Sequence, residues 1–218
     1  MNNHRMRVSI SAGISWLMKL ILLSMLPYEI YIGDYPFALA TLVAIIVSFV
    51  PSIVERNYRI TLPFELDLLI TLVIFLHMFL GELLMFYERV RAWDAILHLF
   101  GTAVTSMLAF MIVYTLHFTG KLRLSIPLVG FFTVIFAMFV GSLWEILEFF
   151  VDIVFDTSAQ KGLGDTMWDL IYDLIAGVVV ALLGMAYVRY AKPEERKRVT
   201  RPLGTLFGTV RREKYDSD

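Results

Sequence analysis

Long apolar segments separated by short polar ones run along the whole chain. Six of them are near or above the roughly 20 residues that a helix needs to cross a bilayer. The pattern predicts an all-α, polytopic membrane bundle of about six transmembrane helices, forming a single domain over residues 1–190. The expected spans are approximately Ile10–Leu26, Phe37–Ile53, Phe64–Tyr87, Ala92–Phe118, Ile126–Asp152 and Met167–Tyr190.

Composition supports a membrane protein. Hydrophobic residues make up 58% of the chain and charged residues 18%, whereas a soluble domain has about half and a quarter. The chain has no cysteine, which excludes disulfides and thiolate metal sites. The net charge of −1 gives no indication of nucleic acid. We expect membrane lipids as partners and no nucleic acid, while the oligomeric state stays open.

Basic residues predict the orientation, because they accumulate in cytoplasmic loops. The N-terminal side carries most of them, including nine between Arg189 and Lys214, and the opposite side has Arg89, Arg91 and Lys161. We therefore expect both termini in the cytoplasm, with residues 191–218 as a basic tail. That tail is expected to be flexible and solvated, with contact to anionic headgroups as the alternative. The first apolar segment is expected to be a retained helix.

Acidic residues lie near the ends of the last four apolar segments, all on the expected outer side. An ionised side chain costs on the order of 3 kcal/mol at mid-membrane, so this concentration requires a partner or a function. The residues are Glu82, Asp94, Glu145, Glu148, Asp152, Asp165, Asp169 and Asp173, and His98 follows Asp94 by one helical turn.

Spacing places these residues on one face of each predicted helix. Steps of three or four residues recur within Asp94–His98, Glu145–Asp152 and Asp165–Asp173, and such steps share a helix face. Gly141 and Gly177 extend two of these stripes and allow close backbone approach. We expect the stripes to face the bundle interior and to converge from four helices.

Three interpretations of the acidic cluster remain open. In the first, a divalent cation of unknown identity neutralises the cluster. In the second, protons and internal salt bridges neutralise it. In the third, the site opens to water and the acids are hydrated. Carboxylates with one imidazole suit a divalent cation. On that interpretation the catalytic candidates are Asp94, His98 (also a candidate ligand) and Asp165, and the metal candidates are Glu82, Glu145, Glu148, Asp152, Asp169 and Asp173.

Two further polar residues lie within the predicted spans. Lys19 is expected to pair with a carboxylate, either Glu65 or Asp67 near the inner face, or Glu82 or Glu145 if it lies deeper. His77 is expected to be a buried, hydrogen-bonded histidine rather than a ligand.

Three ordered motifs carry a family resemblance. They are W-D-x-x-x-H at Trp93–His98, W-E-x-x-E-F-x-x-D at Trp144–Asp152 and D-T-x-x-D-x-x-x-D-x-x-x-G at Asp165–Gly177. Together they resemble YjdF-type predicted inner-membrane proteins, a prokaryotic family of uncharacterised function, over Phe64–Tyr190. A looser likeness to VanZ-like membrane proteins rests on D-x-x-x-H and the last Asp-rich segment. The resemblance implies a multi-pass protein of the prokaryotic inner membrane and no particular reaction.

Three functions follow from these observations. The favoured one is a membrane enzyme that uses a divalent metal to act on a lipid or lipid-linked substrate. A cation- or proton-coupled transporter would use the same carboxylates. A structural or partner-binding protein would use them only to specify helix packing.

Overall fold

The computed structural model describes residues 2–208, and only the backbone for residues 2–9 and 64. All regular elements in this range are helical, which confirms the predicted fold class. Six helices are long and apolar enough to cross a membrane, as predicted. The elements are α1 (Asn2–Ile32), α2 (Tyr35–Tyr58), η1 (Pro63–Glu65), α3 (Leu66–Phe75), the π-helix η2 (Leu76–Leu83), α4 (Phe86–Arg89), α5 (Trp93–Phe118), α6 (Ile126–Phe155), α7 (Leu163–Tyr190) and α8 (Pro193–Leu206).

The first two helices extend beyond the predicted spans, which ended at Leu26 and Ile53. Pro27 lies inside α1 and Pro51 inside α2. Each removes one backbone donor, which a helix in a packed bundle tolerates. The actual α1–α2 turn is short, and the Asp34 side chain caps α2 by accepting a hydrogen bond from the Phe37 amide at 3.2 Å. α2 ends at Tyr58, and the following residue, Arg59, caps it in a left-handed backbone conformation.

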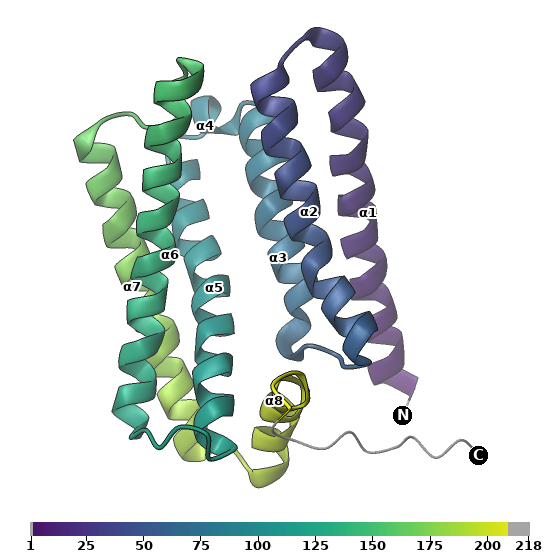
Figure 1. The fold of residues 1–218 in the computed structure, drawn as a ribbon, viewed down its shortest axis with the longest axis vertical. Helices are drawn as coiled ribbons and strands as arrows, with labels where there is room; N and C mark the ends of the chain where they lie inside the picture. Colours follow the sequence, from purple (N-terminus) through teal and green to yellow (C-terminus); the bar gives the residue numbers. More distant parts are fainter. Residues whose placement is uncertain (1, 209–218) are drawn as a thin grey trace.

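The spans form two groups of three (Figure 1). α1, α2 and α3 pack together, α5, α6 and α7 form the second group, and α3 contacts α5 between them. The start of α1 lies at the same end of the molecule as α8, while the α6–α7 connection and α4 lie at the opposite end. An even number of spans returns the chain to the end at which it started, so α8 lies at the same end as the start of α1 (Figure 1).

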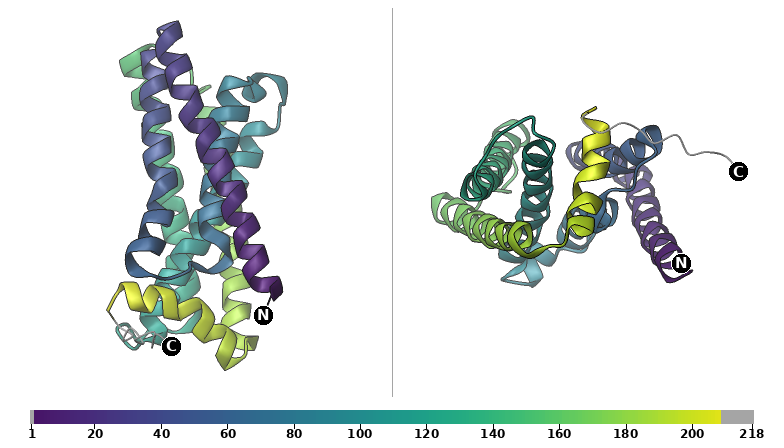
Figure 2. Two further views of the ribbon diagram at one scale, coloured as in Figure 1. Left: turned by 90° about the vertical axis from the view of Figure 1, so that its right-hand side faces the viewer. Right: turned by 90° about the horizontal axis from the view of Figure 1, so that it is seen from below.

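The region after the last span differs from the predicted solvated tail. Over Pro193–Leu206 it forms α8, which runs across the end of the bundle (Figure 2). Val199 and Leu203 are 3% and 2% exposed, because they join a core that includes both groups of spans. The available signal was the four-residue spacing of Val199 and Leu203 within a segment that is otherwise largely polar and charged.

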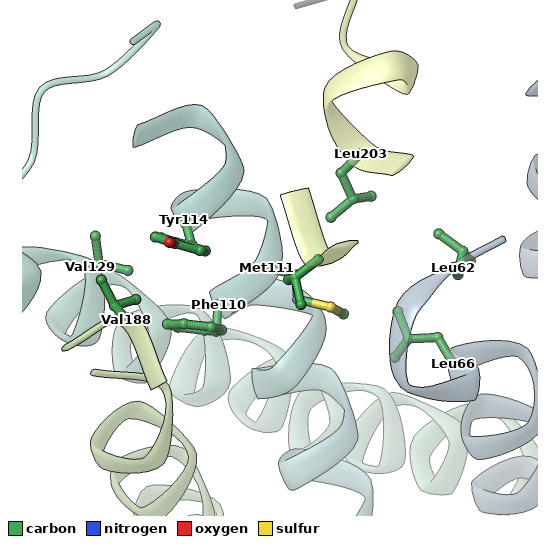
Figure 3. Packing of buried hydrophobic residues seen from close by; sticks show 9 residues of the cluster. Leu62, Leu66, Phe110, Met111, Tyr114, Val129, Val188 and Leu203 are labelled. Atoms are coloured by element: carbon green, nitrogen blue, oxygen red, sulfur yellow. The ribbon is translucent and has the colours of Figure 1, made fainter. Parts of the chain in front are cut away.

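This core connects the two halves of the molecule at the α8 end (Figure 3). Leu203 of α8 lies between side chains of the first group and side chains of the second. Burial of these apolar groups stabilises the connection by about 25 cal/mol for each Å² removed from water. The labelled members are Leu62, Leu66, Phe110, Met111, Tyr114, Val129, Val188 and Leu203.

Large apolar side chains remain exposed on the outer surfaces of the spans. Leu183, Leu17 and Phe139 are 66%, 58% and 57% exposed. A soluble protein rarely exposes apolar surface on this scale, whereas lipid chains require it. The surface is therefore that of a membrane protein.

A buried ion pair lies within the first group of helices. Lys19 has no exposed surface and its Nζ lies 2.8 Å from Asp67 Oδ1, which confirms one of the two inner partners predicted for it. Ser52 donates to the same oxygen at 2.6 Å, and Ser15 donates to Asp67 Oδ2 at 2.6 Å. This network satisfies the charges locally.

Candidate metal-binding site

His98 is the centre of the acidic cluster. It lies in the second turn of α5 and is 8% exposed. Four carboxylates approach its ring within 4.0 Å, from Asp94 on the same helix, Glu145 on α6, and Asp169 and Asp173 on α7. Three of the four helices predicted to converge thus build the cluster, namely α5, α6 and α7.

One side of the imidazole is held by Asp173. Its Oδ1 accepts a hydrogen bond from His98 Nδ1 at 3.2 Å and from the Thr102 hydroxyl at 2.5 Å. The other oxygen, Oδ2, is buried without a hydrogen-bond partner and lies against Gly141, where an added Cβ would overlap it. A carboxylate bound to one ring nitrogen fixes the ring orientation and leaves the other nitrogen available.

The other side of the imidazole faces three carboxylates. His98 Nε2 lies 3.7 Å from Glu145, 3.8 Å from Asp94 and 4.0 Å from Asp169. Ligand-type atoms of Asp94, His98 and Asp169 all lie within 4.8 Å of one another. These are nitrogen and oxygen donors gathered around one point, as in a metal site of a helical bundle.

Glu145 is buried without a hydrogen-bond partner. The residue is 5% exposed, and neither carboxylate oxygen makes a hydrogen bond of normal geometry. Thr166 and Gln160 stand close enough to interact with it, yet the Thr166 hydroxyl is itself without a partner. A buried, unpaired acceptor is costly, so the arrangement favours an additional donor or cation.

Lys161 lies over the cluster from the α6–α7 connection. Its Nζ donates to Asp94 Oδ2 at 3.0 Å, and its backbone amide donates to Asp165 Oδ2 at 3.3 Å. Burial is the largest single influence on the pKa of Lys161 and acts to lower it. The hydrogen bond to Asp94 and the nearby negative charges together outweigh burial, so the pKa is raised overall. Lys161 therefore stays charged at neutral pH and offsets part of the charge of Asp94.

Asp152 shapes the same connection. Its Oδ1 accepts hydrogen bonds from the Thr157 hydroxyl at 2.6 Å and the Ala159 amide at 2.7 Å, and Oδ2 accepts one from the Gln160 amide at 2.9 Å. Both oxygens are thus engaged by the chain that follows α6. The structure gives Asp152 the position of a loop anchor, apart from His98.

Glu82 and Glu148 lie at the margin of the cluster. Glu82 belongs to η2 and is exposed. Glu148 accepts a hydrogen bond from the Trp144 indole at 2.8 Å. The structure brings neither into direct contact with His98 within the described residues.

His77 is hydrogen-bonded, as predicted. Its Nδ1 lies 2.6 Å from the Tyr87 hydroxyl, and its ring packs against Trp144 at 5.1 Å. Burial and, secondarily, the charges of Asp94 and Glu82 raise the pKa of Tyr87, so the phenol keeps its proton. His77 thus belongs to a supporting layer beside the cluster.

Sequence reasoning identified the centre of the site but missed some of its supports. Asp94, His98, Glu145, Asp169 and Asp173 were predicted and are brought together, while Asp165, Asp152, Glu82 and Glu148 lie around them. Thr102 was missed, although it follows His98 by four residues on the same face. Lys161 was counted only as a loop charge, since nothing in the sequence indicates its reach to Asp94.

The fold and site define a multi-pass helical membrane protein with a buried carboxylate–histidine cluster. The chain belongs to the family described as "Predicted membrane protein (DUF2238)", whose family model matches residues 14–190. It is also 36% identical over 137 residues to a protein of Thermotoga maritima described as "Uncharacterized protein", covering 62% of this chain and 69% of that one. No solved structure matches the chain. The YjdF-type resemblance is consistent with this family.

Proposed function

We propose that this chain is a membrane enzyme that binds a divalent cation at Asp94, His98 and Asp169 and acts on a lipid or lipid-linked substrate. One observation carries the proposal. A buried imidazole nitrogen, His98 Nε2, faces three carboxylates within 4.0 Å, and the only nearby lysine of the described residues with a hydrogen bond to any of them is Lys161. This concentration of negative charge needs a counterion in a medium of low dielectric constant.

The donor set fits a divalent cation. A cation with bonds of about 2.1 Å keeps its ligand atoms roughly 3–3.5 Å apart. The separations from His98 Nε2 are 3.7–4.0 Å, and the three proposed ligand atoms lie within 4.8 Å of one another, so these side chains would move closer together to hold the ion. One imidazole with two or three carboxylates suits zinc, manganese or iron(II).

The proposal assigns different roles to the residues around the imidazole. Asp173 and Thr102 orient the ring through Nδ1, while Asp94 faces Nε2 as a ligand. The sequence had instead suggested Asp94 as a catalytic residue and Asp173 as a metal ligand. Glu145 is suited to accept a proton from a reacting group. A bound cation supplies polarisation of a substrate oxygen and activation of water. Asp165 holds the Lys161 segment above the site.

The transport alternative has weaker support. Polar residues follow one face of α5 at four-residue steps from Asp94 through His98 and Thr102 to Ser106. The next position is Phe110, which is 4% exposed within the apolar core at the α8 end. A pathway for ions would need polar groups or water beyond that point, so the row is better suited to a site that opens to one side.

We extend the proposal to the orientation and location of the chain. The basic residues of α8 and of the α5–α6 connection lie at the end opposite the cluster. The preference of basic residues for the cytoplasmic side supports cytoplasmic termini and a site facing outward. The relative in Thermotoga maritima supports the plasma membrane of a prokaryote.

The reaction is tested on the full chain in vesicles of a prokaryotic total polar lipid extract. Lipids are compared by mass spectrometry after incubation with zinc or manganese, or with EDTA. We expect a lipid product that forms only with metal and is lost in His98→Gln, while Glu29→Gln, a buried carboxylate of the first helix group, retains it. Identical lipid profiles in all samples contradict the proposal. A proton or cation flux without metal, lost in Glu145→Gln, would favour the transporter instead.

A further inference from the structure

A groove opens on the outer surface between α6 and α7. It has a volume of about 280 Å³. Ser142, Glu145, Ile146 and Phe149 line it from α6, Thr166 and Leu170 from α7, and Gln160 from the connection between these helices. The four α6 residues follow steps of three, one and three and so share one helix face. The groove thus leads from the lipid-facing surface to a residue of the acidic cluster.

Glu145 connects the groove with the cluster. The residue lines the groove, and its Oε1 lies 3.7 Å from His98 Nε2. It is 5% exposed and neither oxygen makes a hydrogen bond of normal geometry, nor does the buried hydroxyl of Thr166 in the same groove, although Thr166 and Gln160 stand close to the carboxylate. Unpaired buried polar groups aimed into a groove indicate a ligand that supplies the missing donors.

The groove has an apolar part and a polar part. Ile146 and Phe149 are 48% and 49% exposed, and they offer the surface that a hydrocarbon chain covers in a bilayer. Glu145, Ser142, Gln160 and Thr166 offer hydrogen-bonding groups beside it. The carboxylate accepts hydrogen bonds and attracts positive charge, so a headgroup with hydroxyl or ammonium donors is complementary to it.

We infer that the α6–α7 groove is a lateral binding site for a membrane lipid whose headgroup carries hydrogen-bond donors, either hydroxyls or an ammonium. The chain of the lipid lies against Ile146, Phe149 and Leu170, and the headgroup donates to Glu145. The inference rests on the proposed function, since it names the substrate class and its route to that site. Direct entry from the bilayer removes the need for the lipid to leave the membrane.

Photolabelling tests the site without any need for catalysis. The full chain is placed in phosphatidylcholine vesicles that contain a trace of one lipid with a photoactivatable acyl chain, bearing an ethanolamine, glycerol or choline headgroup. Choline lacks hydrogen-bond donors, so it is the matched control. Labelled residues are mapped by peptide mass spectrometry. We expect the ethanolamine or the glycerol lipid to label Ile146, Phe149 and Leu170 about tenfold more than the choline lipid, the ratio that one hydrogen bond to a carboxylate supplies.

Two variants separate the site from general lipid contact. Ser142→Trp fills the groove and is expected to abolish the preferential labelling, whereas Leu143→Trp, a neighbouring position outside the groove lining, is expected to retain it. Glu145→Leu removes the acceptor oxygens and is expected to reduce labelling by the ethanolamine and glycerol lipids to the level seen with the choline lipid. Preference for ethanolamine identifies an amine donor, and preference for glycerol a hydroxyl.

Several outcomes overturn the inference. They are equal labelling by all three lipids, uniform labelling of all lipid-facing helices, and cross-links between two copies of the chain through the groove in place of lipid. Metal content is measured on the same samples. Preferential labelling without bound metal supports the lipid site and contradicts the metal-dependent enzyme, whereas bound metal with uniform labelling contradicts only the lipid site.

Discussion

His98 has two ring nitrogens in different environments, and the proposed chemistry depends on that difference. Nδ1 is bound to Asp173, which Thr102 holds in turn. Nε2 faces Asp94, Glu145 and Asp169. Since a carboxylate on Nδ1 fixes the ring orientation, the proposed function assigns Nε2 to a cation held between α5, α6 and α7.

Gly141 is required for the position of Asp173. A Cβ at this residue would overlap the Asp173 carboxylate, so we expect Gly141→Ala to lower the free energy of unfolding by about 1–3 kcal/mol, as overpacking does. Thermal unfolding in detergent measures the change. Gly13→Ala is the control, because nothing lies within 4 Å of the added atom, and it should be neutral or stabilising. Equal effects of the two substitutions would show that Gly141 has no special packing role.

At the scale of residues, the sequence predicts which side chains come together better than it predicts which atoms contact one another. Regular spacing was enough to bring Asp94 and His98 to one face, and Asp169 and Asp173 to another. It could not distinguish Asp173, which holds the ring from Nδ1, from Asp94, which faces Nε2. That distinction depends on how α7 is rotated against α5, and helix rotation is determined by packing across the whole interface.

At the scale of elements, two acidic residues hold the connection between α6 and α7 in place, although their spacing in the sequence did not distinguish them from the residues around His98. Asp152 anchors residues Thr157–Gln160, and Asp165 holds Lys161. The acidic stripe of α6 therefore continues into a loop anchor beyond Glu145. Sequence spacing does not show where a stripe leaves the bundle, because both parts have the same helical period.

The first helix group depends on the Lys19–Asp67 pair. Removing one partner of a buried pair leaves an uncompensated charge, so Lys19→Met should lower the free energy of unfolding by about 3–5 kcal/mol. Lys19→Met/Asp67→Asn should recover most of this loss, since no charge is left unpaired, and one serine can still donate to the amide oxygen while the other accepts from the amide nitrogen. Chemical denaturation in detergent measures both.

An exposed basic residue provides the control for this pair. Arg89 is exposed, and Arg89→Met should change stability by less than about 0.5 kcal/mol. A double variant as unstable as Lys19→Met alone would contradict the role of the pair, because no unpaired charge would then explain the loss.

The number of spans was predictable because apolar length alone determines which helices can cross a bilayer. The helix ends were less predictable, because prolines commonly mark the end of a helix, yet Pro27 and Pro51 lie within α1 and α2. Neither the π-helical turns of η2 nor the packed helix α8 was predicted. Both depend on tertiary contacts rather than on local preference.

At the scale of the whole molecule, the basic residues of α8 make one end of the bundle positively charged. α8 and the start of α1 share one end, and the N-terminal parts of α5 and α7, which carry His98 and its aspartates, lie toward the other (Figure 1). The chain contains no cysteine, so single cysteines report sidedness without background. We expect a membrane-impermeant maleimide to label Ser158→Cys in intact cells, and to label Lys197→Cys only after permeabilisation. The reverse pattern would place the cluster in the cytoplasm and contradict the proposed orientation.

The division into two helix groups also separates the two buried polar networks. Lys19 and Asp67 lie in the first group, where they pair with each other; the separate Glu29 of that group keeps one oxygen without a partner. His98 and its carboxylates lie in the second, where oxygens of Glu145 and Asp173 have none. The unequal satisfaction of the two networks supports a structural role for the first and a ligand for the second.

Elemental analysis of the detergent-purified chain tests the central claim most directly. Wild type, loaded with zinc or manganese and desalted, should retain about one equivalent of the cation, as one site implies. Asp94→Asn/Asp169→Asn should fall to background, Asp173→Asn should bind about 10–100-fold more weakly, and Glu29→Gln should match wild type. Metal at background in the wild type, or unchanged in Asp94→Asn/Asp169→Asn, would contradict the account.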